Sequence, residues 1–449
     1  MLKRKALEEF TAWRGEHGNR ALLVTGARQV GKTYLVKEFL HVEYENVIEF
    51  DLVEQSDVRA AFDAARNVEE LFMVISAFAG QRLVPGKTVI FIDEVQRCKE
   101  AVTAIKYLVQ QEGYDYVLSG SLLGVELRGV RSLPVGFVRI VDMYPLDFEE
   151  FCWAMGISEE SISLVKDCIR ERKEIPPAYM DVFDRTFRDF MLVGGMPEAV
   201  ALFNETKDYA AVGRLQHDLI ESCRKDINRY NEGSDRIKTE ECFDSIPEQL
   251  AHSDKKFMFA RVDGGKGRNS AAKYRNNLLW IENAGYGNMC RLVTDVHRPL
   301  DSSTERNQFK AYLSDTGLLM EMYGRGAKES LYEGDRYFNE GAIAENVFAE
   351  CLVKSGIRPR YHRKSNGPNK MELDFVIELG RELTVIEIKS GKDRSAPSIE
   401  KVPRVFAVDR RMVMGNSNIY VTDDGIEHYP LFASAFITSM ERSWDAPRF

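Results

Sequence analysis

Short apolar runs alternate with stretches of helical character in the N-terminal part of the chain. The apolar runs lie at residues 21–26, 46–52, 87–95, 114–121 and 137–146. Strands that alternate with helices form a parallel sheet, whose strands are buried on both faces and are therefore apolar along their length. We predict a parallel α/β domain at this end of the chain, preceded by an amphipathic helix within residues 1–19.

The pattern changes after Pro145, where the acidic and aromatic stretch DFEEFCWAMG replaces the strands. Residues 147–240 have mostly helical spacing. Residues 241–330 combine short helices with a strand-like tail, which favours a winged-helix-like unit. Residues 331–449 open with a helix and continue with short alternating strands. These changes predict four domains, with the first one ending at residue 146.

Length and composition indicate a multidomain protein without a membrane segment. A chain of 449 residues exceeds one ordinary core, and its net charge of -9 argues against a uniformly basic nucleic-acid surface. Seven scattered cysteines, never arranged as C-x-x-C, indicate reduced thiols rather than disulfides or a zinc site. No apolar run reaches the ~18 residues of a membrane span, and no signal-like segment opens the chain, so we expect a cytoplasmic protein.

The segment GARQVGKT, which follows the first apolar run, fits the phosphate-binding pattern G-x-x-x-x-G-K-[ST]. Its members are Gly26, Ala27, Arg28, Gln29, Val30, Gly31, Lys32 and Thr33. Glycines let backbone N–H groups surround a phosphate, and the helix that follows directs its positive dipole end toward the anion. Lys32 would neutralise phosphate charge and the Thr33 hydroxyl would bind Mg²⁺, so the segment predicts an ATP site.

The strand TVIFIDE delivers Asp93 and Glu94 at its C-terminal end, where open α/β sheets bind ligands. Asp93 would hold Mg²⁺, and Glu94 would orient or deprotonate the attacking water. At the end of the next strand, Ser119 or Ser121 could sense the γ-phosphate or cap a turn. The pair of carboxylates therefore predicts hydrolysis of ATP.

An arginine could also stabilise the charge that develops during hydrolysis, from within the chain or from a second copy. The candidates are Arg28, Arg128 and Arg131.

These motifs, together with SLPVGFVRIVDMYPLDFEEF and LVGGMPEAV, resemble the bacterial and archaeal AAA-type ATPases that carry a DUF4143 C-terminal region. The resemblance covers most of the chain. It implies an α/β fold with a P-loop ATPase core, a helical lid, a winged-helix-like middle and a C-terminal module similar to PD-(D/E)XK nucleases. It implies no particular pathway.

The C-terminal part contains a second group of candidate residues, within MELDFVIELGRELTVIEIKSG. Two alternating strands flank a turn at Gly380; Glu387 and Lys389 share one face of the second strand, and Asp374 can approach that face. Glu345, on the preceding helix, could supply a fourth group. Metal-dependent phosphodiester cleavage needs carboxylates around Mg²⁺ and a cation beside them.

Two interpretations of this group remain open. Asp374, Glu387 and Glu345 could hold a catalytic metal, with Lys389 as the charge-stabilising cation. Alternatively, the group is a structural salt-bridge network on a nuclease-like fold, because E-x-K is common on solvated strands. Leu373 stands where the nuclease pattern has proline.

The segment between Asp254 and Arg275 is the most basic window of the chain. Its cations are Lys255, Lys256, Arg261, Lys266, Arg268, Lys273 and Arg275. They could contact a DNA backbone, form a solvated loop, or pack on the acidic ATPase domain.

The leading hypothesis is an ATP-dependent switch or motor coupled to a nuclease-like effector that binds or cleaves nucleic acid. The rival is a regulatory ATPase whose other regions only bind a protein or DNA partner. A small-molecule kinase is disfavoured because Asp93 and Glu94 indicate hydrolysis. The oligomeric state is left open.

Overall fold

The structure is a computed structural model that describes residues 2–16, 20–111, 113–121, 135–231, 233–262, 270–333, 340–367, 370–390 and 396–441. Four predicted functional residues, Arg128, Arg131, Lys266 and Arg268, lie outside these ranges. The chain forms two compact units. The N-terminal unit comprises residues 3–145 with 283–285, and the C-terminal unit comprises the chain from 146 to 282 and from 286 onward.

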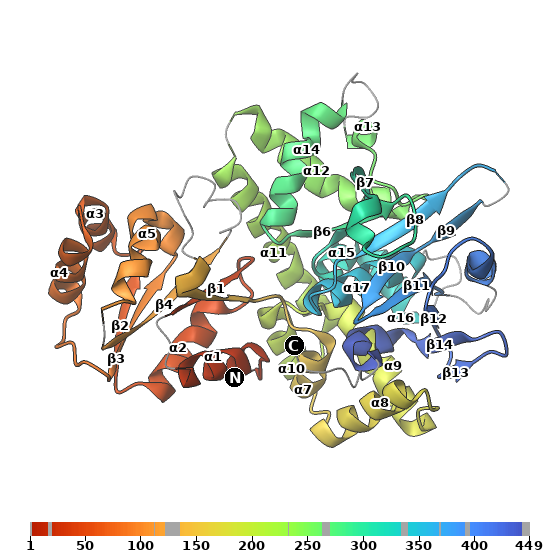
Figure 1. Cartoon of the computed structure of the whole chain (residues 1–449), viewed down its shortest axis with the longest axis horizontal. Coiled ribbons are helices and arrows are strands. Elements are labelled where there is room, and N and C mark those ends of the chain that lie inside the picture. Colours follow the sequence, from red (N-terminus) through yellow and green to blue (C-terminus); the bar gives the residue numbers. More distant parts are fainter. Residues whose placement is uncertain are drawn as a thin grey trace. The chain divides into compact units, whose positions relative to one another are not determined.

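The N-terminal unit is a five-stranded parallel sheet with helices packed against it (Figure 1). In chain order its main elements are α1 (Ala6–Gly15), β1 (Ala21–Gly26), α2 (Lys32–Glu43), β2 (Asn46–Asp51), α3 (Ser56–Ala64), α4 (Val68–Phe78), β3 (Thr88–Asp93), α5 (Lys99–Leu108), β4 (Tyr114–Ser121) and β5 (Val138–Asp142). The strand order is β2-β3-β4-β1-β5. The predicted parallel α/β domain is confirmed.

The core of this unit explains the strand pattern. Every residue of β3 is buried, and Ile90 and Ile92 pack in one apolar cluster with residues of α3, α4 and α5. On α1 and α2, Phe10 and Phe39 meet edge to face with ring centroids 5.5 Å apart. Strands buried in this way need continuous apolar sequences, which is why the apolar runs located them.

The C-terminal unit begins with a helical region. Its helices are α7 (Phe148–Ala154), α8 (Glu159–Glu171), α9 (Pro177–Val193), α10 (Pro197–Thr206), α11 (Tyr209–Tyr230), α12 (Ser234–Ala251), α13 (Phe259–Val262) and α14 (Ser270–Asn283). The aromatic side chains of the first helices form its core: Phe148 contacts the rings of Phe183, Phe187 and Phe190. No helix among the described residues is long and apolar enough to cross a bilayer.

Two sheets follow in the same unit. Their elements are β6 (Gly287–Val293), β7 (Thr304–Leu313), α15 (Thr316–Tyr323), α16 (Arg325–Glu333), α17 (Glu340–Lys354), β8 (Arg360–Lys364), β9 (Met371–Leu373), β10 (Phe375–Leu379), β11 (Glu382–Ile388), α18 (Pro397–Lys401), β12 (Arg410–Gly415), β13 (Tyr420–Val421) and β14 (Ile426–Pro430). One sheet has the order β7-β6-β8-β9 and the other β10-β11-β12-β14-β13. The β6–β7 hairpin therefore shares a sheet with β8, across the predicted boundary at residue 330.

The predicted C-terminal hairpin differs from the expectation in one respect. The hairpin itself is present, since β10 and β11 pair antiparallel around Gly380, with Phe375 opposite Ile386. Its first strand, however, is interrupted at Asp374: β9 pairs with β8 in one sheet, and β10 pairs with β11 in the other. Asp374 is therefore the residue at which the chain passes between two sheets.

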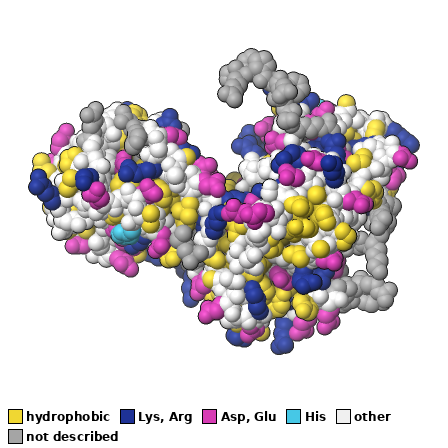
Figure 2. All heavy atoms as spheres, turned by 90° about the horizontal axis from the view of Figure 1, so that it is seen from below, with side chains coloured by type: hydrophobic (Ala, Val, Ile, Leu, Met, Phe, Trp, Pro, Cys, Tyr) yellow, Lys and Arg dark blue, Asp and Glu magenta, His cyan; other side chains and the backbone are white. Residues whose placement is uncertain are grey.

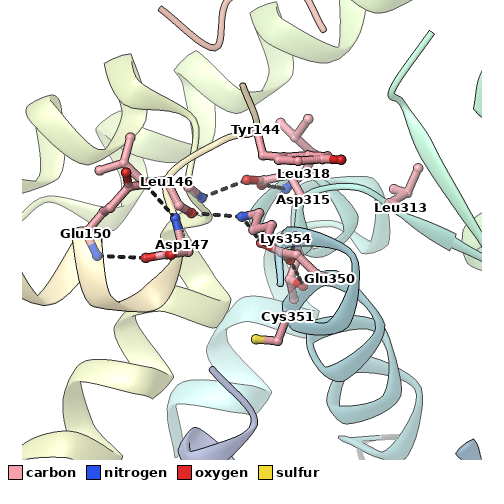
Figure 3. Close-up of polar contacts among 12 residues, drawn as sticks. Tyr144, Leu146, Asp147, Glu150, Leu313, Asp315, Leu318, Glu350, Cys351 and Lys354 are labelled. Carbon is pink, nitrogen blue, oxygen red and sulfur yellow. Dashed lines mark hydrogen bonds and ion pairs between the residues drawn. The ribbon is translucent and has the colours of Figure 1, made fainter. Parts of the chain in front are cut away.

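A buried polar network connects distant segments of the C-terminal unit (Figure 3). Lys354, at the end of α17, donates to Glu350 Oε1 at 2.6 Å and to the Leu146 carbonyl at 2.8 Å. The other carboxylate oxygen of Glu350 accepts from the N–H and hydroxyl of Thr316, at 2.8 and 2.6 Å. Lys354 thus connects Leu146 to α17.

Asp315 extends the network to the loop before α10. It accepts from the Gly195 N–H at 2.7 Å and caps α15 through the Leu318 N–H at 3.0 Å. The Gly195 carbonyl in turn accepts from the Leu146 N–H at 2.6 Å. Burial raises the pKa of Asp315 and of Glu350, and the charge of Lys354 opposes both shifts.

We predict that Lys354→Met lowers the free energy of unfolding by about 3–5 kcal/mol, because it leaves buried carboxylates without their cation. The loss should grow with pH. A carboxyl whose folded pKa is raised favours folding while it is protonated, and that contribution disappears as pH rises through the folded pKa. Denaturant unfolding from acidic to mildly alkaline pH measures both effects.

Lys364→Met is the matched control for this prediction, because Lys364 is exposed at the end of β8 in the same unit. It should change stability by no more than about 0.5 kcal/mol. Equal effects of the two substitutions, or a pH-independent loss, would contradict the role given to Lys354.

Candidate functional site

The predicted phosphate-binding loop connects β1 to α2. Gly26 has a φ of 142°, and a Cβ there would lie 2.1 Å from the Met143 carbonyl oxygen, so the position admits only glycine. Gln29 and Gly31 have φ values of 64° and 88°, and Gly31 is the N-cap of α2. Left-handed residues that lead into a helix turn successive N–H groups toward one point, which is the geometry that binds phosphate.

Lys32, the first residue of α2, points back over this loop. Its Nζ donates to the carbonyls of Gly26 at 3.1 Å and Ala27 at 2.7 Å, and to Ser121 Oγ at 3.1 Å. Burial lowers the pKa of Lys32 to about 8, although Glu94 and Asp93 oppose the shift and Arg28 adds to it. The ammonium group of Lys32 therefore loses its proton at a lower pH than that of an exposed lysine.

Thr33, Asp93 and Ser119 meet at the carboxyl ends of the central strands. Thr33 Oγ1 donates to Asp93 Oδ2 at 2.7 Å, and Ser119 Oγ donates to Asp93 Oδ1. Asp93 and Ser119 are both buried. Hydroxyl and carboxylate oxygens are the donors that Mg²⁺ prefers, and sites of this kind complete its shell with water and substrate phosphates. The donor set therefore fits a magnesium ion bound together with a nucleotide.

Glu94 follows directly, in an unusual backbone conformation. Its φ of 53° is left-handed, which is uncommon for a residue with a side chain. One carboxylate oxygen accepts from Ser121 Oγ at 3.1 Å, and the other accepts from Gln96 Nε2 at 2.6 Å. Gln96 was not among the predicted site residues. The local sequence could not identify it, because only the 3-10 turn Val95–Arg97 brings its amide back to Glu94.

The predicted C-terminal group forms around a buried cation that sequence reasoning missed. Lys310 of β7 is 1% exposed, and its Nζ lies 3.1 Å from Glu345, 3.4 Å from Glu372 and 3.8 Å from Asp374. A second cation, Lys255, lies 2.5 Å from the other oxygen of Glu345. The helix and strand carboxylates are thus brought together, with ammonium groups between them.

The remaining members lie next to this group. Asp374 Oδ2 accepts from the Ile388 N–H at 3.0 Å, and Lys389 pairs with Glu387 Oε1 at 2.7 Å. Glu387 Oε2 is buried and has no hydrogen-bond partner among the described residues. Within the same described part of the chain, no cluster of three or more His, Cys, Asp or Glu side chains could hold a metal ion.

The pKa values of the carboxyl groups in this cluster are shifted in different directions. Burial alone would raise the pKa of Glu345, but Lys310 and Lys255 lower it to about 2. Burial, followed by repulsion from Glu345, raises the pKa of Asp374 to about 7. Burial opposes the charge of Lys310, yet the surrounding carboxylates raise its pKa. The neighbouring charges therefore shift the pKa values of Glu345 and Asp374 in opposite directions.

Three of the described cations of the basic window have hydrogen-bond or ion-pair partners within the protein. Lys255 is paired with Glu345, Lys256 donates to Gln308 at 2.8 Å, and Arg261 pairs with Asp254 at 3.2 Å. On the face shown in Figure 2, basic and acidic side chains are interspersed. Contact with DNA through this window stays a prediction, because its central residues lie outside the described ranges.

Three family models match parts of the chain. A family described as an AAA domain matches residues 18–152. Two domains of unknown function, DUF8612 and DUF4143, match residues 184–329 and 340–432. No curated protein sequence matches the chain.

Several solved structures are similar to parts of the chain. A Walker-type ATPase of Pyrococcus abyssi is 14% identical over 72% of this chain and 96% of its own, with a TM-score of 0.44. The RuvB Holliday junction branch migration motor of Thermotoga maritima is 14% identical over 65% and 90%, with a TM-score of 0.27. The Aeropyrum pernix ORC1 protein in complex with DNA is 10% identical over 75% and 94%, with a TM-score of 0.31.

The family matches agree with the parallel sheet, its phosphate-binding loop and the strand that ends in two carboxylates. The chain therefore combines an AAA-type ATPase domain with a DUF4143 C-terminal region.

Proposed function

We propose that the N-terminal unit binds ATP with Mg²⁺ and hydrolyses it. The observation that supports this most directly is the 2.7 Å contact between Thr33 Oγ1 and Asp93 Oδ2. It joins the phosphate-binding loop to the acidic end of β3, two elements that are far apart in the sequence. A glycine-rich loop with only a structural role needs no such partner.

Each residue of the site then has a chemical role. Lys32 exchanges the carbonyls of Gly26 and Ala27 for phosphate oxygens. Thr33 and Asp93 hold the magnesium ion, which when bound neutralises charge on the phosphates. Glu94 orients the attacking water and accepts its proton, because it is the carboxylate next to the metal site.

Substitutions at Lys32 and Glu94 should separate binding from turnover. Lys32→Ala should weaken ATP binding by about 2–3 kcal/mol, since a charged hydrogen-bond donor is lost in the ground state. Glu94→Gln should keep binding but lower kcat by roughly 100-fold or more, since the amide cannot accept the proton. Nucleotide titration and phosphate release distinguish the two effects.

Lys37→Ala is the control for these variants, because Lys37 lies on the same helix and pairs with Glu49 at 2.9 Å. It should leave both measurements unchanged. Normal turnover by the Glu94→Gln protein would remove Glu94 from the catalytic role.

The lowered pKa of Lys32 predicts how binding depends on pH. Only the charged ammonium attracts phosphate, and the amine loses its proton as pH rises through about 8. ATP affinity should therefore fall between neutral pH and pH 9, as measured by nucleotide titration. In Lys32→Arg the guanidinium stays charged over this range, so any remaining affinity should be independent of pH. The same decline in both proteins would show that another group causes it.

For the C-terminal unit we propose binding of a partner without cleavage. The supporting observation is Lys310, whose fully buried ammonium lies among Glu345, Glu372 and Asp374. A metal-dependent centre needs those oxygens for its cation. The nucleotide state of the N-terminal unit would then act as the switch, and the C-terminal unit as the part that recognises the partner.

Metal-dependent cleavage is the second candidate, and the observation in its favour is the unpartnered Glu387 Oε2. A buried carboxylate oxygen without a donor is costly unless a cation completes it. In that case Asp374, Glu387 and Glu345 would have to move together to hold the metal, since the described residues contain no such cluster as they stand. Lys389 would then stabilise charge in the transition state.

A cleavage assay on the full chain separates the two candidates. We expect no cleavage of linear, nicked or supercoiled DNA, or of RNA, with Mg²⁺ or Mn²⁺ and with or without ATP. Cleavage that disappears in both Asp374→Ala and Glu387→Ala, while the ATPase rate is retained, would establish the nuclease instead. Stimulation of the ATPase rate by DNA would identify nucleic acid as the partner, and indifference to DNA would favour a protein.

A further inference from the structure

Two side chains, Ser121 and Gln96, donate hydrogen bonds to the carboxylate of Glu94, and Ser121 is also hydrogen-bonded to Lys32. Ser121 Oγ donates to one carboxylate oxygen at 3.1 Å, and the same Oγ accepts from Lys32 at 3.1 Å. Gln96 Nε2 donates to the other oxygen at 2.6 Å. The serine is thus one step in a chain of hydrogen bonds from the phosphate-binding lysine to the carboxylate, whereas the glutamine lies outside that chain.

A bound phosphate would act on these two contacts differently. Lys32 has to turn from the loop carbonyls and Ser121 toward a phosphate, which breaks the hydrogen bond that orients the Ser121 hydroxyl. The amide of Gln96 donates to Glu94 and is not among the hydrogen-bond partners of Lys32, and its own Oε1 is buried without a partner among the described residues. Of the two donors to Glu94, Gln96 is therefore the one that phosphate binding leaves in place.

The backbone at Glu94 explains why its side chain needs such a partner. The residue has a left-handed φ of 53°, between the end of β3 and the 3-10 turn Val95–Arg97. The backbone N–H of Glu94 donates a hydrogen bond to Asp93 Oδ1 at 2.9 Å. This bond fixes the backbone of Glu94 but does not fix its carboxylate. A left-handed backbone at a residue with a side chain persists only where surrounding contacts hold it. Gln96, which is 5% exposed, supplies that contact from a fixed turn.

We propose that Gln96 is a positioning residue for ATP hydrolysis, an inference that rests on the proposed function of Glu94. Gln96 holds one carboxylate oxygen of Glu94 and leaves the other, once Ser121 releases it, to receive the proton of the attacking water.

The test replaces the amide while keeping its size. Gln96→Met removes the donor, and Gln96→Glu replaces it with a carboxylate that repels Glu94. We expect kcat to fall by roughly 100-fold in Gln96→Met, as for other small misplacements of a reacting group, and further in Gln96→Glu. The dissociation constant for ATP should change by less than about twofold in Gln96→Met, because the hydrogen bonds of Lys32 and Thr33 do not involve Gln96. Thermal unfolding of each variant shows whether the unit still folds.

The matched control is Gln81→Met, since Gln81 lies in the same unit and its amide donates to the Val47 carbonyl at 3.0 Å. It should keep the wild-type kcat. A structural role of Gln96 would lower stability and ATP affinity together with kcat, whereas a positioning role lowers kcat alone.

A double variant separates this inference from the function on which it rests. In a Glu94→Gln background, Gln96→Met should cause no further loss of rate, because the group it positions has already been removed. A Gln96→Met protein with wild-type kcat, or a full additional loss in the double variant, would overturn the inference while ATP hydrolysis stands. A wild-type protein without magnesium-dependent ATPase activity would instead overturn the proposed function and this inference with it.

Discussion

A charged group that is buried away from water needs an opposite charge or a hydrogen-bond partner. In the C-terminal unit this requirement concerns mainly helix α17. The side chains of α17 from Ala342 to Leu352 are buried, yet Glu345, Glu350 and Asn346 are among them. Each unpaired ion would cost several kcal/mol. The segment from Lys310 to Thr316 supplies the partners, through Lys310, Tyr312, the Leu313 backbone and Thr316. The order of polar groups on the helix thus determines how β7 and α15 pack beside it.

The N-terminal unit uses polar groups in the opposite way. The partners of Lys32, and one of the two partners of Glu94, are exchangeable: they are backbone carbonyls and a hydroxyl that a phosphate or a water molecule can replace. Burial also lowers the pKa of Lys32. Burial acts in the same direction on Lys310, but the surrounding carboxylates raise the pKa of that lysine. Exchangeable contacts suit a site that must bind and release a ligand, and fixed contacts suit a framework.

Sequence patterns were sufficient where structure depends on local residues. The five strands of the N-terminal sheet were predictable because burial on both faces demands apolar runs. The phosphate-binding loop was predictable because its glycines and lysine lie at fixed spacing within one short segment, Gly26 to Thr33. The interruption at Asp374 was not, since the alternation of residues 371–379 is the same whether one sheet or two receives them. Lys255 looked like part of a basic surface, and only the fold shows that it is paired with Glu345, 90 residues away.

The cation at the centre of the C-terminal group belongs to the chain itself. Where a metal ion balances buried carboxylates, stability depends on the supply of that metal, and a chelator can unfold the domain. The ammonium of Lys310 is covalently attached to β7, so it cannot be extracted, exchanged for another ion or lost on dilution. The charge balance of this framework therefore does not depend on the metal content of its surroundings.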